Sequence, residues 1–376
     1  MRRAIWLVVL VVVLAAGGGL AWLWRTGTPS WSVSPSLMFG FCHANDEIGA
    51  NERAEIDAAA SAFMEEFLAN PAAAHADMAV AARQTITPEQ LTIARAQYLS
   101  LGAAAPRQTA NTYLMRFATG SRHGEKVACN IHGNPRRPDL VARGGTWRSA
   151  VVLMTESIDS GAAERATSVW MDHESGGWRV RGFFFTLSRI NGMGVEEFWT
   201  RAKSERRAGH GLNASVLYSA AASTLDRGDF LVLSIAPDFI SDQHGFAGPP
   251  EFLGDPPYPV ELDGQRYNIV TMQTHGAREG TFLFIKHQLP GWPDNAAAEA
   301  ANRQFIDGFN ARYPEWRDVF DGLIVRAVRP NSNAAWGTVY FKDRGFRQAA
   351  PEPTPGITQV TAQAPPTTTP QAPAAP

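Results

Sequence analysis

The nine histidines are the first residues to search for chemistry in this chain of 376 residues, because an imidazole ligates metal ions and exchanges protons near neutral pH. None of them falls in an H-x-x-x-H or H-E-x-x-H pattern, and no Asp-x-Asp-x-Asp calcium loop occurs. The Gly-x-Ser-x-Gly motif of hydrolases, a phosphate-binding Gly-Lys-Ser loop and a dinucleotide-binding fingerprint are also missing. We therefore expect no metal site and no cofactor.

His275 and His287 form the most site-like constellation. Each ends one of two predicted strands, and a hairpin between these strands would make the two imidazoles cross-strand neighbours. Glu261 or Asp263 would then lie nearby. The simpler interpretation is that both histidines are surface residues in turns.

Three further candidates for acid–base chemistry fall in predicted strands: Tyr113, Glu156 and Asp172. Burial of such a group shifts its pKa toward neutrality, which suits a general acid or base. Tyr113 lies in an apolar run and is expected to pack in a core. Glu156 and Asp172 lie near strand ends, where carboxylates normally face water. No pair among the three has a spacing that requires catalysis, so the catalytic residues stay unknown.

The two cysteines, Cys42 and Cys129, predict a disulfide if the chain is exported. Closing a loop of roughly ninety residues stabilises by at most about 4–5 kcal/mol in the chain-entropy model. Two separate buried thiols are one alternative. A metal site with the neighbouring His43 and His132 is another, although adjacent residues seldom both reach one zinc ion.

The segment that positions everything else is residues 5–24, which carry no charge and span roughly 30 Å as a helix, the thickness of a bilayer core. We expect a signal-anchor helix over residues 1–25. A cleavable signal peptide with a site at Gly19-Leu20-Ala21 is the alternative. Arg2 and Arg3 precede the span and only Arg25 follows it, which places the N-terminus in the cytoplasm.

The predicted location is therefore the inner (cytoplasmic) membrane, crossed once, with the main domains exported to the periplasm or the outside. Trp22 and Trp24 suit the membrane interface and favour the anchor. Residues 26–49 are rich in Ser, Pro and Gly and are interpreted as a stalk that holds the next domain clear of lipid.

Residues 50–205 are predicted to form an α+β domain of helices followed by antiparallel strands. Asn51 opens an amphipathic helix that Asn70-Pro71 ends, and Thr87 caps a second one from Pro88 to Leu101. The expected strands are 112–118, 126–131, 147–155, 167–171 and 178–187.

The closing hairpin of this domain, TSVWMDHESGGWRVRGFFF, resembles that of the nuclear transport factor-like superfamily, and in particular its exported bacterial members of unknown function. The resemblance covers roughly residues 50–190. It implies a cone-like curved antiparallel sheet wrapped round a helix, with an apolar pocket at its mouth. In that superfamily the pocket is a ligand site, an active site or a packed core. Tyr113, Trp178 and Phe184 are the candidate ligand-binding residues here.

Residues 206–347 are predicted to form a second α+β domain, and a faint echo of the first leaves a duplication open. Its expected elements are helices 213–225 and 294–313 and strands 230–235, 267–273, 281–287, 323–328 and 336–341. Between them, Gly248 to Pro259 is a proline-rich loop. Its Phe252 and Tyr258 either contact a partner, since a stiff loop loses little entropy on binding, or cover a sheet edge.

Charge and the tail limit the choice of partners. The net charge is −2 without a concentrated basic face, which argues against nucleic acid. A small basic cluster at Arg201, Lys203, Arg206 and Arg207 is interpreted as a solvated helix face, with anionic partners as the alternative.

Residues 348–376, rich in Pro, Thr and Ala, predict a disordered tail that acts as a spacer or as a handle for an envelope component.

The sequence thus favours a membrane-tethered cell-envelope protein of unknown activity that acts as a non-catalytic binding or accessory module for a protein or an apolar ligand. The alternative is a cofactor-independent enzyme that transfers protons or hydrates a small molecule in the cone pocket. A carboxylate, His or Tyr pointing into a pocket lined by Phe and Trp would favour the enzyme.

Overall fold

The computed structural model describes residues 40–102, 104–117, 126–129, 140–143, 147–228, 231–291, 294–330 and 334–347. The predicted anchor at residues 5–24, most of the predicted stalk and the tail at 348–376 lie outside the described residues. Within those ranges, no helix is long and apolar enough to cross a bilayer. The chain is a mixed α+β protein whose strands pair antiparallel, as predicted, except for one parallel pair in the second large sheet.

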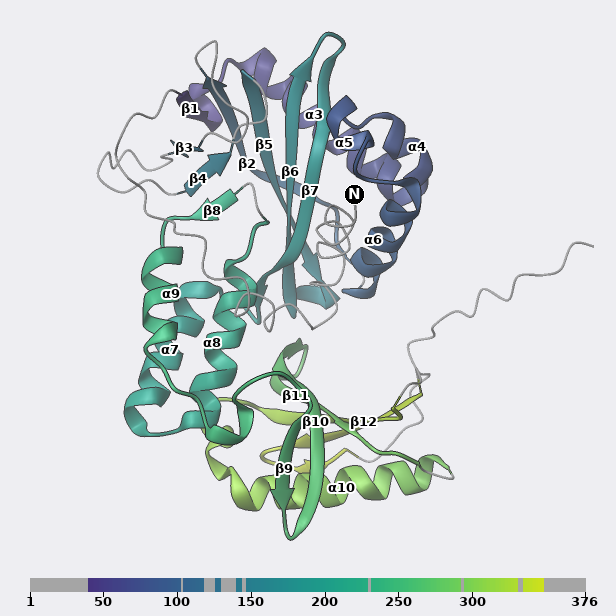
Figure 1. Cartoon of the computed structure of the whole chain (residues 1–376), viewed down its shortest axis with the longest axis vertical. Helices are drawn as coiled ribbons and strands as arrows, with labels where there is room; N and C mark the ends of the chain where they lie inside the picture. Colours follow the sequence, from purple (N-terminus) through teal and green to yellow (C-terminus); the bar gives the residue numbers. More distant parts are fainter. Residues whose placement is uncertain are drawn as a thin grey trace, which may run out of the picture.

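The first sheet has five strands in the order β1-β2-β5-β6-β7, and all neighbours are antiparallel (Figure 1). Its strands are β1 (Gly40–Ala44), β2 (Gln108–Phe117), β5 (Arg148–Ile158), β6 (Ala163–Glu174) and β7 (Gly177–Ile190). Strand β1 occupies the end of the segment that the sequence predicts to be a stalk. The β6–β7 turn uses Gly177 at φ +112°, a conformation that favours glycine.

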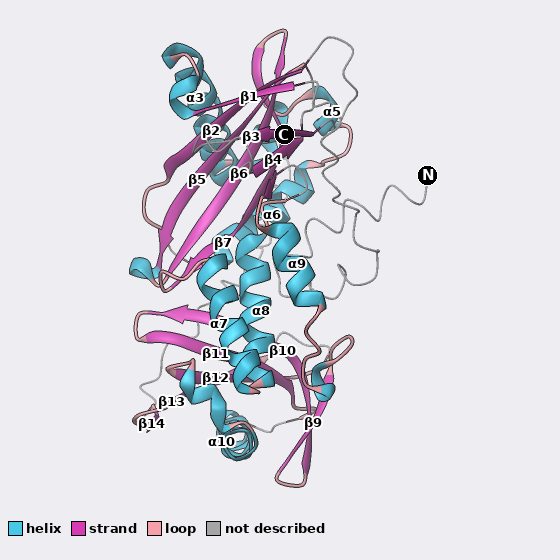
Figure 2. Cartoon of the chain, turned by 90° about the vertical axis from the view of Figure 1, so that its left-hand side faces the viewer, coloured by secondary structure: helices cyan, strands magenta, loops and turns pink. Residues whose placement is uncertain are grey.

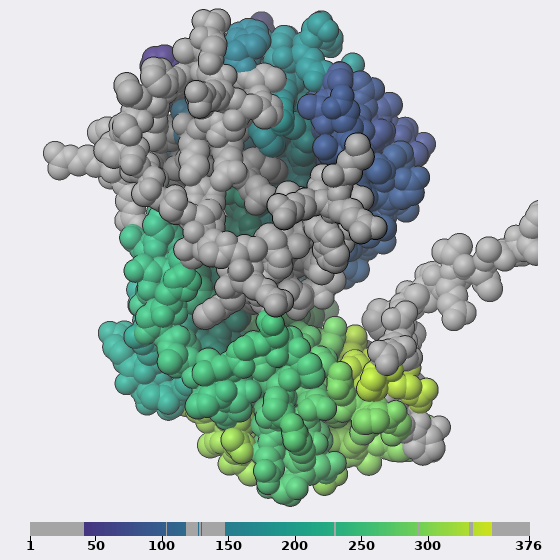
Figure 3. Space-filling view, in the orientation of Figure 1, coloured from purple at the N-terminus to yellow at the C-terminus, as the bar shows by residue number. Residues whose placement is uncertain are grey.

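In the part of the chain that the structure describes, four α-helices precede β2: α3 (Ala50–Ala69), α4 (Pro71–Ala76), α5 (Val80–Arg83) and α6 (Pro88–Ser100). The predicted start of α6 is confirmed, since the Thr87 hydroxyl accepts from Gln90 N and the Gln90 side chain accepts from Thr87 N. Asn70, which follows the end of α3, caps α4. The space-filling view shows the segment of α4–α6 (blue) on the surface beside the sheet (Figure 3).

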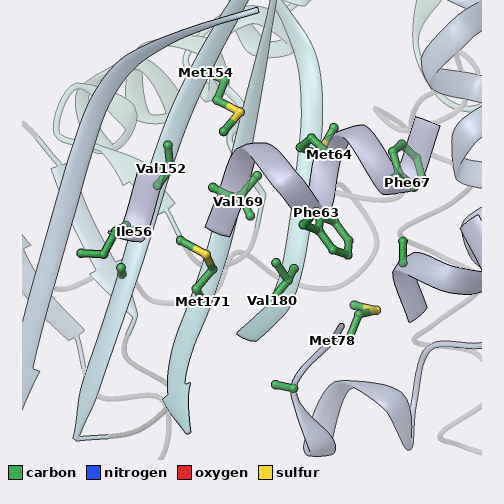
Figure 4. Close-up of a cluster of buried hydrophobic side chains, with 14 of the residues drawn as sticks. Ile56, Phe63, Met64, Phe67, Met78, Val152, Met154, Val169, Met171 and Val180 are labelled. Carbon is green, nitrogen blue, oxygen red and sulfur yellow. The ribbon is translucent and has the colours of Figure 1, made fainter. Parts of the chain in front are cut away.

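Helix α3 lies across one face of the first sheet and supplies most of the core there (Figure 4). Its buried residues recur every three or four positions, which is the apolar stripe of an amphipathic helix. They are Ile56, Ala60, Phe63, Met64 and Phe67, and they meet Val152, Met154, Val169, Met171 and Val180 of the strands. We call this the helix-covered face.

The opposite face of the sheet packs against a three-stranded sheet of β3 (Lys126–Cys129), β4 (Leu140–Arg143) and β8 (Leu231–Leu233). The predicted disulfide is confirmed: Cys42 of β1 bonds to Cys129 of β3, with their Cα atoms 5.2 Å apart. The two alternatives, free thiols and a metal site, are therefore wrong. The bond joins the edge strand of the large sheet to the small one.

Three helices follow: α7 (Val195–Ala208), α8 (Gly211–Leu225) and α9 (Ala236–His244). They bury a common cluster that includes Phe198, Leu217, Tyr218 and Phe239. The predicted domain boundary at residues 205 and 206 falls inside α7. Asn213, predicted as a helix cap, instead lies buried as the third residue of α8.

The second large sheet has the order β14-β13-β12-β11-β10-β9. Its strands are β9 (Tyr258–Leu262), β10 (Gln265–Ala277), β11 (Gly280–Gln288), β12 (Gly322–Val328), β13 (Ala335–Phe341) and β14 (Gly345–Phe346). Strands β11 and β12 are parallel, and α10 (Asn295–Arg312) forms the crossover between them. Because the first sheet is wholly antiparallel, the second is not a copy of it.

Helix α10 covers one face of the second sheet with Phe305, Ile306 and Phe309. The other face is turned toward the first sheet (Figures 1 and 2). The two parts touch where the β10–β11 hairpin meets the start of β6: a Cβ on Gly276 would lie 2.2 Å from the Ala162 carbonyl oxygen. Asn191 Nδ2 also donates to Thr281 Oγ1 at 3.0 Å. Only glycine fits at position 276 without displacing one of the two parts.

The disulfide generates a stability prediction. Replacing both cysteines (Cys42→Ala with Cys129→Ala) removes the cross-link between two residues that are 87 positions apart. The free energy of unfolding should fall by about 4 kcal/mol. Urea unfolding of the purified proteins measures this. A reductant should destabilise the wild type by a similar amount and leave the double variant unchanged. A loss below about 1 kcal/mol would show that the bond does not constrain the unfolded chain.

Candidate functional site

The helix-covered face of the first sheet is the place where the sequence predicts an apolar pocket, and aromatic side chains fill it. The Phe67 ring lies 4.7 Å from Phe183 and 6.0 Å from Tyr98, centroid to centroid. Phe63 meets Phe183 at 5.5 Å and Phe185 meets Tyr98 at 5.1 Å. These edge-to-face contacts are those of a packed core.

A buried ionic cluster closes this face at the α6 end. Glu156, which is 4% exposed, accepts hydrogen bonds at Oε1 from the Tyr98 hydroxyl and from Arg107 Nε, the latter at 2.6 Å. Its Oε2 accepts from the Arg165 guanidinium. The prediction that Glu156 faces water is wrong, because the β5–β6 register sets it opposite Arg165 and α6 covers both.

The charges of this cluster determine what it can do. Burial opposes ionisation of Glu156, but the Tyr98 hydrogen bond and the two arginines hold its pKa below the ordinary value. Burial raises the pKa of Tyr98, and the Arg165 guanidinium lies 3.5 Å above the Tyr98 ring. Glu156 therefore stays a carboxylate at neutral pH and does not act as a proton donor. The cluster ties α6 to the sheet.

Asp172 is also buried, at 1% exposed, on the opposite face of the first sheet. Ser149 Oγ donates to its Oδ1 at 2.8 Å and Arg181 donates to its Oδ2 at 2.8 Å. The Arg181 guanidinium lies 4.8 Å from the Trp170 ring. The prediction that Asp172 faces water is wrong, because the strand register sets it opposite Ser149, where the Ser149 hydroxyl and Arg181 enclose it.

The far end of the helix-covered face carries Trp178, one of the predicted binding residues. Its ring lies 5.1 Å from His173, and the Arg148 guanidinium lies 5.3 Å above it. Glu52, at the start of α3, accepts from Arg148 at 2.6 Å. Trp147 lies 6.5 Å from His173 and is 57% exposed, so this end presents an aromatic side chain to solvent.

Tyr113 and Phe184, the other two predicted binding residues of the first domain, belong to the core on the opposite face. Tyr113 is buried, and Phe184 packs at its margin. A Cβ on Gly228 would lie 2.8 Å from Phe184 Cβ, so the chain after α8 passes close over this ring. Neither residue lies on the face with α3.

The two candidate histidines of the second sheet are not neighbours. Strand β10 sets His275 opposite Phe282, and it is Ile269 that lies opposite His287. His275 is exposed, but His287 is fully buried between β11 and α10, so the surface-turn interpretation is wrong for it. Glu261 lies opposite Arg266, at the end of the sheet away from His275.

His287 belongs to a buried polar network under α10. Its Nε2 lies 2.8 Å from Asn302 Oδ1, and its ring stacks on Phe305 at 4.8 Å. The Asn302 amide donates to Thr338 Oγ1 and to the Trp336 carbonyl, both at 3.0 Å, which turns its Oδ1 toward the imidazole. Nε2 is therefore the donor, and burial lowers the pKa of His287.

The proline-rich loop packs against the core of the second sheet next to its edge strand β9. Phe252 lies 5.8 Å from Tyr258 and 6.0 Å from Tyr313, and both Phe252 and Tyr258 pack against the core under α10. Tyr313 donates to Glu251 at 2.6 Å, which holds the loop to the end of α10. Leu253 at its tip is 59% exposed.

Two surface hollows are lined by acidic and basic groups, and in the first of them these groups pair with each other. The larger, of about 580 Å³, lies at the start of α3, where Arg53 bonds Asp46 at 3.0 Å and approaches Asp57 at 3.7 Å. The other, of about 310 Å³, lies beside Phe341 and Arg344. Within the described ranges, no group of three His, Cys, Asp or Glu residues is arranged to hold a metal ion.

One cluster has no counterpart in the sequence-based predictions. On the face of the second sheet away from α10, Lys286 and Arg326 lie directly opposite each other on the parallel strands β11 and β12. Both cations approach the ring of Phe284. Only the register of a crossover pair brings together residues forty positions apart, so no local motif could reveal them.

Comparisons with protein families and with known proteins add no assignment. No family model, no curated protein and no solved structure matches this chain.

The buried cluster around Glu156 predicts that one substitution strongly lowers the free energy of unfolding. Glu156→Gln removes the charge that compensates Arg165 and Arg107 and should lower the free energy of unfolding by about 3–5 kcal/mol. The matched control is Asp77→Asn, which breaks a more exposed pair with Arg179 and should cost less than about 1 kcal/mol. Urea denaturation compares the two. Equal losses would mean that the buried cluster contributes no more than a surface pair.

His287 predicts a dependence of stability on pH. Because its pKa is lowered in the folded chain, the unfolded chain takes up a proton first as the pH falls below about 6.5. The wild type should therefore lose up to about 1.4 kcal/mol per pH unit below that value, relative to His287→Leu. Unfolding curves from pH 7.5 to 5 measure the difference, with the exposed His244→Asn as control. A difference that does not change with pH would contradict a neutral buried imidazole.

Proposed function

We propose that this chain is an exported cell-envelope protein, tethered to the inner membrane by residues 5–24, that works as a non-catalytic binding or accessory module. Its partner is an envelope protein or an apolar ligand rather than nucleic acid. The proposal extends to a nuclear transport factor-like fold for the first domain, over roughly residues 50–190.

The fold assignment is supported by the order of the elements. Helices α3 to α6 come first, and an antiparallel sheet follows that ends in the long β6–β7 hairpin. Helix α3 lies across one face of that sheet, as a helix does in a cone. The Gly176-Gly177-Trp178 turn that carries the resemblance is the tip of that hairpin.

The observation that carries the non-catalytic role is the filling of the helix-covered face. Where an enzyme of this fold places its acid or base, Phe63, Phe67, Phe183 and Phe185 contact one another. Glu156, whose partner Tyr98 contacts Phe67 and Phe185, is held ionised by two arginines and hydrogen-bonded at both oxygens. Both features favour a scaffold over proton transfer.

Export is supported by the disulfide between Cys42 and Cys129, since such bonds persist in oxidising compartments. The surface that we assign to partner binding in the first domain is its aromatic end, with Trp147 exposed beside His173 and Trp178. Exposed tryptophan next to arginine is typical of binding hot spots.

A cofactor-independent enzyme remains the second candidate function, and one observation favours it. His173 lies 5.1 Å from Trp178 at the end of the helix-covered face, so one titratable group is present beside an aromatic ring. Substitution separates the roles: in an enzyme His173→Asn abolishes turnover without unfolding, whereas in a binding module it alters partner capture.

Location is tested with reporter fusions after residue 347. We expect an alkaline phosphatase fusion to be active and a green fluorescent protein fusion to be dark, with the chain retained in alkali-washed membranes. A fluorescent fusion would overturn export. A mature N-terminus just beyond Ala21 would overturn the anchor and leave a secreted protein.

Partner binding is tested by affinity purification of the full chain from solubilised membranes, beside a chain that lacks residues 1–25. We expect the anchored chain to enrich a partner and the Trp147→Ala variant to lose it. Because the Trp147 side chain is exposed and has few internal contacts, the substitution should leave the domain folded. If both chains recover the same partners at equal yield, the anchor does not organise the interaction.

A further inference from the structure

The face of the second sheet opposite α10 carries an unusual arrangement of charge. We call it the cationic face and define it by five half-buried residues on three adjacent strands: Phe284, Lys286, Ile324, Arg326 and Val339. Leu283, Ile285, Leu323 and Val325 alternate with them and point to the core under α10. The cationic face is thus the second side of a sheet whose first side is fully packed.

Two like charges meet directly on this face. In the parallel register, Lys286 pairs with Arg326 and Phe284 pairs with Ile324. Like charges directly opposite each other destabilise a sheet. Among the ion pairs of the described residues, none involves Lys286 or Arg326. Burial lowers the pKa of Lys286, and the charge of Arg326 lowers it further. Among the described residues the pair therefore has no ion-pair partner, and a bound anion would supply the counter-charge.

The apolar surroundings of the pair are equally specific. The Lys286 ammonium lies 5.5 Å and the Arg326 guanidinium 5.7 Å from the centroid of the same ring, that of Phe284. Ile324 and Val339 continue the apolar row across the next two strands. Gly337, opposite Arg326, has no side chain to cover the guanidinium. A pair of cations thus borders an aromatic and aliphatic surface.

The position of the face limits the size of its occupant. It is turned toward the first sheet, and the β10–β11 hairpin that borders it touches that part of the chain at Gly276 (Figure 2). A membrane surface or a folded partner cannot lie flat on a face that is hemmed in this way. Junctions between two parts of a chain are common sites for small ligands.

We propose that the cationic face binds a small organic carboxylate with an apolar body, whose carboxylate lies between Lys286 and Arg326 and whose body packs on Phe284, Ile324 and Val339. This inference concerns a different surface from the aromatic end of the first domain and does not depend on where the chain is located.

The test is isothermal titration calorimetry of the purified full chain with 3-phenylpropionate. We expect saturable binding that Lys286→Met or Arg326→Met weakens by about tenfold or more, the effect of one charge-assisted hydrogen bond. The matched control, Lys342→Met, removes an equal charge from the Asp321 pair and should change affinity by less than about twofold. Phe284→Leu should weaken binding of 3-phenylpropionate and leave any weak response to inorganic phosphate unchanged.

Three results would overturn the proposal: no saturable binding to the wild type, equal binding of the uncharged 3-phenylpropionamide, or equal losses in Lys342→Met and Lys286→Met. Unfolding provides a second, independent measurement. Since Lys286→Met relieves the repulsion, its urea midpoint should rise above that of the wild type in the absence of ligand. A lower midpoint would contradict an uncompensated cation pair.

Discussion

The packing of α3 on the first sheet is the constraint on which the rest of the structure depends. Five apolar residues of this helix, at intervals of three and four, enter the core that the strands supply. The four larger ones, Ile56, Phe63, Met64 and Phe67, each stabilise by about 1.5–3 kcal/mol when fully buried, and none would do so without the sheet beneath it. Figure 4 shows Phe63 and Phe67 of α3 in this cluster, and the Phe183 ring of the sheet packs against both. Within the described residues, the same contacts that stabilise the domain therefore fill the space where the sequence predicts a ligand pocket.

Both parts of the chain attach a helix to a sheet through a buried polar network. In the first part, Glu156 connects Tyr98 of α6 to Arg165 of β6. In the second, Asn302 of α10 connects His287 of β11 to Thr338 of β13. Burying such groups costs free energy that their hydrogen bonds offset in part, and in the second network His287 Nδ1 is buried without a hydrogen-bond partner among the described residues. We therefore interpret both networks as devices that fix the register of helix on sheet.

Much of the fold follows from local signals in the sequence. The Thr87–Gln90 capping box with Pro88 fixes the start of α6, and the Gly176-Gly177 turn fixes the β6–β7 hairpin. The disulfide follows from the count of two cysteines in a chain predicted to be exported. The burial of Glu156, Asp172 and His287 could not be predicted, because each finds its partner through strand register or helix packing. The pairing of Lys286 with Arg326 depends on the register of two parallel strands joined by a crossover helix. Such a register is even harder to predict from a sequence than the burial of these three side chains.

The central claim is that α3 is locked against the sheet and closes the helix-covered face. Native-state hydrogen exchange measures this most directly. If the account is correct, the amides of Phe63, Met64 and Phe67 exchange only through global unfolding, with the same free energy as the amides of Val152 and Val169 in the central strands. If the α3 amides exchange with a free energy several kcal/mol lower than the strands, the helix opens by itself, and the face beneath it is an accessible pocket rather than a core.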